Sequence, residues 1–184
     1  MFGLFKKKDK GMPVTDRVWM NEQAKWQACL DSYLQNNQTV FVAWFEESRN
    51  KLKAFFAGKG IADAAVYDAG FYNTMPANNV QIIFVEHFPL QETEQQKFRD
   101  LALQKAVVYT SLDEALFEVF GGEKIVQLML KMGMKENEAI QHSMVTAAIK
   151  RAQEKLAGKA IISGSSKSQR DWLQSAGISN DVNG

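Results

Sequence analysis

Three titratable side chains stand where predicted strands end, and the ligand sites of parallel α/β sheets lie at such ends. Asp68 ends the strand predicted within "AAVYDAG", and Glu86 and His87 follow "VQIIFV". Together they could form an acid–base cluster. The alternative is that they are polar residues at the edge of the sheet. We expect the second arrangement, because no nucleophile or second histidine is placed to work with them.

Two Gly-Lys pairs raise the question of a phosphate loop. They are Gly58-Lys59 in "AFFAGKGI" and Gly158-Lys159 in "KLAGKAI". A phosphate loop needs G-x-x-x-x-G-K-[ST], because its backbone amides surround the phosphate and its hydroxyl binds magnesium. Both stretches lack the first glycine and the hydroxyl, and both end a helical pattern. We therefore predict helix C-caps, and the chain also lacks G-x-G-x-x-G.

A metal site finds few ligands in this composition. Cys29 is the single cysteine, and it has apolar neighbours at helical spacing, so we expect it in the core. A metal would have to rely on His87, His142 and carboxylates, and we expect a surface or capping role for His142. We predict no metal and no cofactor. One cysteine also fits a reducing, cytoplasmic compartment.

The bulk composition is that of a globular domain. The 184 residues are 46% hydrophobic and 23% charged, with a net charge of +1. This balance gives no global field that favours nucleic acid or a strongly acidic partner. No apolar run approaches the roughly 20 residues of a membrane span.

The elements that must position these side chains alternate along the chain. Continuous apolar runs predict strands that are covered on both faces, and amphipathic stretches between them predict helices. This alternation predicts an α/β fold with a parallel sheet. Strands are expected at 39–45, 64–70, 80–88 and 106–111, and helices at 19–34, 46–58, 91–104 and from about 112 to 156, with at most a short helix at 170–178.

The first 14 residues are predicted to be a flexible lead with apolar and basic side chains. In this lead, the apolar residues could enter a lipid surface while the lysines meet anionic headgroups. The alternative is a disordered tail without a lipid partner. The candidate membrane contacts are Phe2, Leu4, Phe5, Lys6, Lys7 and Lys8.

A long stretch resembles the end of the second nucleotide-binding domain of SecA, the preprotein translocase motor. It runs from Tyr109 to Leu156, "YTSLDEALFEVFGGEKIVQLMLKMGMKENEAIQHSMVTAAIKRAQEKL". The family has a strand followed by "SLEDDL", then "FGG-[ED]-[RK]-I", "LMDRLGM" and "EDEPIEH", and a helix similar to "MVSRAIENAQKKVE". The residues here that match its motifs include Asp113, Glu114, Phe120, Gly121, Gly122, Glu123 and Lys124.

The resemblance implies a RecA-like, helicase C-terminal-type domain. Its upstream part is similar to the helix, strand and helix that open the same domain. On this basis the domain spans residues 15–158 and is helical from about 112, with a polar tail at 159–184.

The departures from the family concern its catalytic parts. The first motor domain is absent, and with it the phosphate loop and the carboxylate that binds magnesium. Glu86 and His87 align with an Arg-His pair of the family, and Arg99 is the one cation of the right kind in the arginine-rich region. An arginine finger contributes about 10³ to 10⁵ in rate, so we predict no ATPase activity.

The expected function is therefore that of a non-catalytic protein-interaction module, accessory to protein translocation and working by binding a translocase component. It would be cytoplasmic, with peripheral contact to the inner membrane face. One alternative is a nucleic-acid-binding domain of the helicase C-terminal type, which the lack of a basic stripe disfavours. Another is a small enzyme whose site lies at the strand ends around Asp68 and His87.

Overall fold

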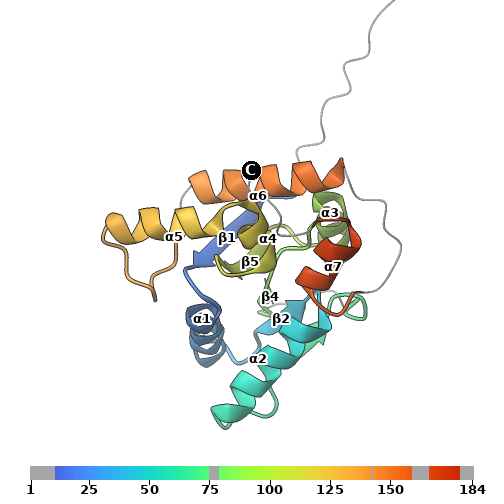
Figure 1. The fold of residues 1–184 in the computed structure, drawn as a ribbon. Coiled ribbons are helices and arrows are strands. Elements are labelled where there is room, and N and C mark those ends of the chain that lie inside the picture. The colour runs from blue at the N-terminus through green and yellow to red at the C-terminus, as the bar shows by residue number, and fades with distance from the viewer. Residues whose placement is uncertain (1–10, 75–78, 142, 159–165, 179–184) are drawn as a thin grey trace, which may run out of the picture.

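A parallel sheet in the order β1-β5-β4-β2-β3 forms the centre of the computed structural model, which describes residues 11–74, 79–141, 143–158 and 166–178 (Figure 1). Helices cover both faces, so the predicted α/β class is confirmed and the architecture is consistent with a RecA-like fold. The strands are β1 (Val14–Trp19), β2 (Val40–Ala43), β3 (Val66–Asp68), β4 (Ile82–Phe84) and β5 (Ala106–Ser111). The helices are α1 (Glu22–Gln35), α2 (Glu46–Gly58), α3 (Gln91–Asp100), α4 (Ala115–Phe120), α5 (Gly122–Lys131), α6 (Ser143–Ala157) and α7 (Gln169–Ser175).

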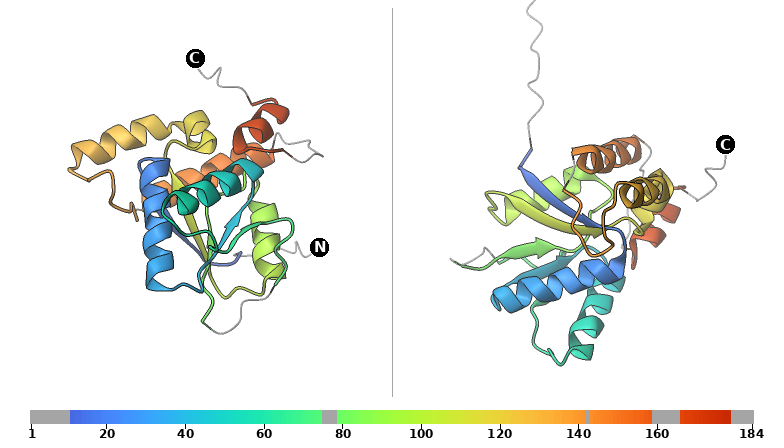
Figure 2. Two further views of the ribbon diagram at one scale, coloured as in Figure 1. Left: turned by 90° about the horizontal axis from the view of Figure 1, so that it is seen from below. Right: turned by 90° about the vertical axis from the view of Figure 1, so that its left-hand side faces the viewer.

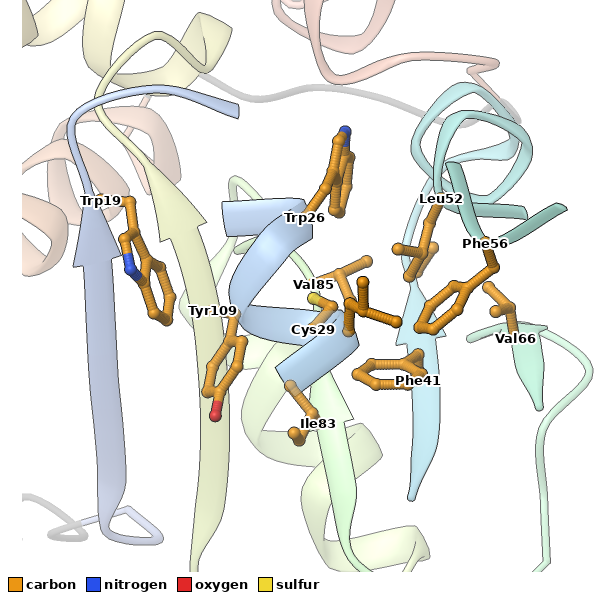
Figure 3. Packing of buried hydrophobic residues seen from close by; sticks show 12 residues of the cluster. Trp19, Trp26, Cys29, Phe41, Leu52, Phe56, Val66, Ile83, Val85 and Tyr109 are labelled. Carbon is orange, nitrogen blue, oxygen red and sulfur yellow. The ribbon is translucent and has the colours of Figure 1, made fainter. Parts of the chain in front are cut away.

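The central strands are apolar on both sides because each face of the sheet carries its own core. Phe41 and Ile83 pack with the buried residues of α1 and α2 on one face (Figure 3). Val42 and Phe84, their neighbours in the sequence, pack with Phe98 of α3 on the other face. Figure 2 shows α1 and α2 on one side of the sheet and α3 and α6 on the opposite side. This explains why these strands lack the alternation of a half-exposed strand.

Strands β2 and β4 are neighbours in the sheet, and the chain leaves them toward opposite edges. After β2 the chain passes through α2 to β3, outward to one edge. After β4 it passes through α3 toward β5 and β1, in the opposite direction. The crevice at the carboxyl ends of two such strands is where open α/β sheets bind ligands. We call it the switch point.

The C-terminal helices pack on the carboxyl end of the sheet. Leu116 of α4 and Leu156 of α6 share a buried cluster with Trp172 and Leu173 of α7. The short final helix predicted near this position is confirmed as α7, at Gln169–Ser175. The described part of the predicted polar tail is therefore not solvated throughout, because α7 contributes two buried apolar side chains.

One predicted helix start is wrong, and one strand was not predicted. The helix expected from Trp19 to Leu34 begins only at Glu22, where the side chain of Asn21 accepts a hydrogen bond from the backbone N–H of Ala24. Trp19 belongs to strand β1, which pairs with β5 along its whole length. The sequence pattern did not predict this strand, because β1 lies at the edge of the sheet and carries three polar residues, 15–17. The candidate membrane contacts Phe2 to Lys8 lie outside the described residues, as does His142.

Candidate functional site

The switch point is occupied by the chain's own carboxylate. Glu86, which follows β4, is 2% exposed. Its Oε1 accepts hydrogen bonds from the backbone N–H groups of Trp44 and Phe45, at 2.9 and 3.0 Å. Its Oε2 accepts a hydrogen bond from the hydroxyl of Ser48, at 2.6 Å. Glu86 thus fills the N-terminal end of α2, which is where an anionic ligand would bind in such a fold.

One backbone N–H group in the first turn of α2 also has a partner within the chain. The backbone N–H of Glu47 donates to the carbonyl of Lys167, at 3.0 Å. Burial and then the charge of Glu114 raise the pKa of Glu86 to about 7, against the opposing effect of Lys25. Glu86 therefore takes the backbone N–H groups of Trp44 and Phe45, which precede α2, and a phosphate at this position would compete with it for them.

Beside Glu86 lies a buried ion pair. The Nζ of Lys25, from α1, is 2.6 Å from Oε1 of Glu114 and donates to the carbonyl of Val85 at 3.0 Å. It also lies 4.1 Å from the ring centroid of Trp26. Burial lowers the pKa of Lys25, but the negative charge and hydrogen bond of Glu114 outweigh burial, so the pKa lies above its usual value. Lys25 is therefore a cation and not a neutral nucleophile.

The matched residues Asp113 and Glu114 hold elements together at this end of the sheet. Oδ2 of Asp113 accepts a hydrogen bond from the backbone N–H of Glu22, in the first turn of α1, at 2.9 Å. Glu114 accepts from the backbone N–H of Ser111 and the hydroxyl of Thr110 as well as from Lys25. Both residues thus tie the β5–α4 turn to its surroundings.

The glycine pair of the matched motif is explained by backbone geometry. Gly121 has a φ of +89°, between α4, whose last residue is Phe120, and α5. A Cβ added to Gly122 would lie 2.5 Å from the carbonyl oxygen of Leu112 and 2.7 Å from Cβ of Phe117. The first glycine therefore allows the turn and the second allows close packing. Glu123 and Lys124 are exposed in the first turn of α5.

His87 lies in a separate buried network. Its Nδ1 is 2.9 Å from Oε1 of Glu94 on α3, and its Nε2 is 3.3 Å from Oδ1 of Asp16 on β1. The amide of Gln153, on α6, donates to the other oxygen of Glu94 at 2.7 Å. Burial lowers the pKa of His87, but the two carboxylates raise it to about 10. The imidazolium thus joins three elements of the fold.

The acid–base cluster, which the sequence left as the less favoured possibility, does not assemble. His87 is 3% exposed; its Nδ1 is hydrogen-bonded to Glu94, and its Nε2 lies at ion-pair distance from Asp16. Asp68 accepts a hydrogen bond from the backbone N–H of Gly70 at 2.7 Å. Within the described residues no hydrogen bond or ion pair joins Asp68, Glu86 and His87. Arg99 is exposed and donates to the side chain of Gln96 at 2.9 Å.

The residues that complete these networks were not found by sequence analysis. Asp16 stands in a polar stretch close to the predicted lead, Lys25 in a polar part of α1, and Glu94 among the charges of α3. Their burial depends on contacts with segments distant in the chain, so no local pattern marks them. Cys29 is buried as predicted, and burial raises the pKa of its thiol to about 12.

An open cleft lies next to the switch point, between the ends of α3 and α6 and the start of α7. Its volume is about 1100 Å³. Trp44, Phe88 and Trp172 line it, and Asp68 lies at its border. His87 is not among its lining residues. By contrast, a space of only about 140 Å³ remains beside Glu86 and Glu114.

Residues 11–74, 79–141, 143–158 and 166–178 contain no group of three histidine, cysteine, aspartate or glutamate side chains that could hold a metal ion. None of the helices in these ranges combines the length and the hydropathy that crossing a membrane requires.

Part of the chain is similar to protein translocase subunit SecA. The chain is 50% identical to the protein from Christiangramia forsetii over 48 residues, which are 26% of this chain and 4% of that protein. It is 47% identical to the Anaeromyxobacter protein over 53 residues, 29% of this chain and 6% of that protein. It is 50% identical to the Acidithiobacillus ferrooxidans protein over 48 residues, 26% of this chain and 5% of that protein. No family model matches the chain.

These matches establish a SecA-like region in about a quarter of the chain. The matched stretch covers only about a twentieth of the length of each of these relatives.

Proposed function

We propose that this chain is a non-catalytic, SecA-like protein-interaction module that is accessory to protein translocation. In this proposal residues 15–158 correspond to the second nucleotide-binding domain of the family. The similarity to SecA over 48 to 53 residues supports a link to translocation. The partner would be a component of the translocase, met on the cytoplasmic side of the membrane.

The observation that carries the proposal is the position of Glu86. In a doubly wound sheet the phosphates of a nucleotide would lie at the switch point, against the first amides of the following helix. Here the amides of Trp44 and Phe45 and the hydroxyl of Ser48 are bonded to Glu86. A triphosphate would have to displace this carboxylate or lie against its negative charge, both of which cost free energy.

The charged groups nearby do not replace the missing catalytic parts. Phosphoryl transfer depends on positioning and on stabilising negative charge, which phosphate loops, magnesium and arginine side chains supply. Lys25 is bound to Glu114, and Arg99 is on the exposed surface of α3 with Gln96 as its partner. The proposal therefore includes the absence of ATPase activity.

The enzyme alternative around Asp68 and His87 is weakened by the same geometry. A general acid or base has to be within hydrogen-bond reach of a substrate. His87 is buried between two carboxylates, and its raised pKa keeps it protonated at neutral pH.

Binding measurements test the proposal. The intact chain is immobilised, and purified SecA and membranes containing the translocase are passed over it. We expect saturable binding to one of them and no ATP hydrolysis by the chain with magnesium present. The Arg99→Ala variant serves as the matched control for hydrolysis.

Two results would contradict the proposal. The first is ATP hydrolysis by the intact chain that Arg99→Ala abolishes. The second is the absence of binding to either translocase preparation together with binding to RNA whose affinity falls steeply with salt concentration, which would favour the nucleic-acid alternative.

A further inference from the structure

The open cleft described above has an aromatic floor. The ring centroids of Trp44 and Phe88 are 5.1 Å apart, and those of Phe88 and Trp172 are 5.6 Å apart. The indole Nε1 of Trp44 is buried and has no hydrogen-bond partner among the described residues. At the border of the cleft, the side chain of Phe71 is 85% exposed. This surface suits large apolar side chains.

The rim of the cleft is predominantly acidic. Two lysines are also present, of which Lys97 donates a hydrogen bond to Asn73 at 2.9 Å. Glu92 and Glu154 are exposed and form no ion pair with another described residue. The charged lining residues are Glu46, Asp68, Glu92, Asp100 and Glu154, with Lys97 and Lys167. An aromatic floor with such a rim is complementary to a segment that joins large apolar side chains to lysines.

The chain itself contains a segment with this chemistry. Residues 1–10 read "MFGLFKKKDK", with four large apolar side chains followed by four lysines and one aspartate. The segment joins the described part of the chain beside α3. The backbone N–H of Met12 donates to Oε1 of Gln95 at 2.5 Å, and the amide of Gln95 donates back to the carbonyl of Met12 at 3.3 Å.

The connection point lies close to the cleft along α3. Gln95 immediately precedes Gln96 and Lys97, which both line the cleft. Residues 6–11 join Phe5 to Met12, and these six residues can span up to about 20 Å when extended. Because the segment is covalently attached beside α3, it has a high local concentration at the cleft.

We propose that the cleft is an interaction surface for residues 1–10 of this chain, with Phe2, Leu4 and Phe5 on the aromatic floor and the lysines at the acidic rim. The same side chains are the candidates for lipid contact, so occupancy of the cleft withdraws them from a membrane surface. Docking in the cleft and contact with lipid are alternatives for one segment. The proposal does not depend on a role in translocation.

A peptide competition experiment in the intact chain tests this proposal. The probe is a fluorescein-labelled peptide of sequence MFGLFKKKDK, and binding is followed by fluorescence anisotropy. The lead variant carries Phe2→Ser, Phe5→Ser, Lys6→Glu and Lys7→Glu, so its own segment no longer competes. We expect the peptide to bind the lead variant about ten-fold more tightly than the unmodified chain, because a tethered competitor acts at a high effective concentration.

The rim variant locates the binding to the cleft. It adds Asp100→Lys and Glu154→Lys to the lead variant, and we expect it to bind the peptide at least about ten-fold more weakly than the lead variant does. The control adds Asp63→Lys and Glu123→Lys, which change the net charge equally at exposed positions outside the cleft. This control should bind the peptide as the lead variant does.

Three results would overturn the proposal. One is equal peptide affinity in the unmodified chain and the lead variant. Another is affinity that survives the rim substitutions or is lost equally in the control. The third is full co-sedimentation of the unmodified chain with phosphatidylglycerol vesicles while the peptide fails to bind the lead variant, which would assign residues 1–10 to lipid.

Discussion

Two neighbouring regions at the carboxyl end of the sheet use their charged residues in opposite ways. At the switch point, Glu86 is 2% exposed and the side chain of neighbouring Glu114 is 9% exposed, and they receive their hydrogen bonds from Lys25 and from backbone and hydroxyl groups. In the cleft, Glu92 and Glu154 are exposed and form no ion pair with a described residue. The first region is closed by the chain, and the second is open.

The two regions differ in whether their charged side chains are bound to other parts of the fold or are free to bind a ligand. A buried charge whose partners all belong to the fold contributes to holding the elements in place, and removing one partner is costly. An exposed charge without a partner costs little to change. The motif residue Glu114 belongs to the closed region, and the exposed Asp113 accepts a hydrogen bond from the backbone N–H of Glu22, so both residues have a structural role at this end of the sheet.

Replacing Lys25 with methionine tests the closed region most severely. The substitution removes the partner of Glu114 and leaves a buried carboxylate without a counter-ion. We expect the free energy of unfolding to fall by about 3–5 kcal/mol, measured by urea denaturation at pH 7. The control is Lys51→Met, whose lysine is half-exposed and pairs with Glu47 and Glu22. It should cost less than about 1 kcal/mol, and equal losses in both variants would refute the distinction.

The next largest effect is expected at alkaline pH and concerns His87. Its pKa is about 10 in the folded protein and 6.5 as the ordinary value, so the folded state binds the proton more tightly. This stabilisation is complete below pH 6.5 and is lost as the pH rises toward 10, at about 1.4 kcal/mol per pH unit.

Urea denaturation between pH 6.5 and 9.5 measures this slope for the unmodified chain and for His87→Gln. The variant should be less stable at pH 6.5, because Asp16 and Glu94 lose their common cation. Its stability should also depend less on pH across the window. An unchanged slope in the variant would show that another group titrates.

Titration of Glu86 should change the free energy of unfolding by a smaller amount, and over a lower pH range, than titration of His87 does. Its folded pKa of about 7 exceeds the ordinary value of 4.5, so its contribution is complete below pH 4.5 and is lost as the pH rises through 7. The loss amounts to about 3 kcal/mol. Glu86→Gln keeps an oxygen for the N–H groups of Trp44 and Phe45 but does not titrate. Its urea-denaturation profile should be flatter between pH 4.5 and 7, and an equally steep profile would contradict the assignment.

The sequence predicted most of the sheet because its signal is local. The runs that form β2 and β4 are apolar throughout, and β5 opens with Ala106 to Tyr109 before the polar Thr110 and Ser111; burial on both faces favours such apolar runs. Strand β1 was missed because it lies at the sheet's edge and mixes Val14 and Val18 with polar residues. Its identity as a strand depends on pairing with β5, which is distant in the sequence.

The networks at the candidate site were less predictable for a related reason. His87 was found at a strand end, but its partner Asp16 comes from β1 and its partner Glu94 from α3. Lys25 stands among polar residues of α1 and is nevertheless 1% exposed, because Glu114 reaches it from the β5–α4 turn. Hydrophobic periodicity describes which residues are apolar, and it gives no information on which charges pair after folding.

The smallest effect on stability is expected in the open cleft, where the effect on binding should instead be measurable. Phe71 is 85% exposed at the border of the cleft, so Phe71→Ser should change the free energy of unfolding by less than about 0.5 kcal/mol. In the lead variant defined above, the same substitution should weaken binding of the MFGLFKKKDK peptide several-fold, because an aromatic contact at the floor's edge is lost.

Leu34→Ser is the matched control, since Leu34 is 68% exposed and lies outside the cleft. It should leave both the unfolding free energy and the peptide affinity unchanged within error. If Phe71→Ser destabilised the chain as strongly as Lys25→Met, the border of the cleft would belong to the closed structure, and the contrast between the two regions would fail. If neither serine variant altered peptide affinity, the contact at Phe71 would have to be removed from the proposed interaction surface.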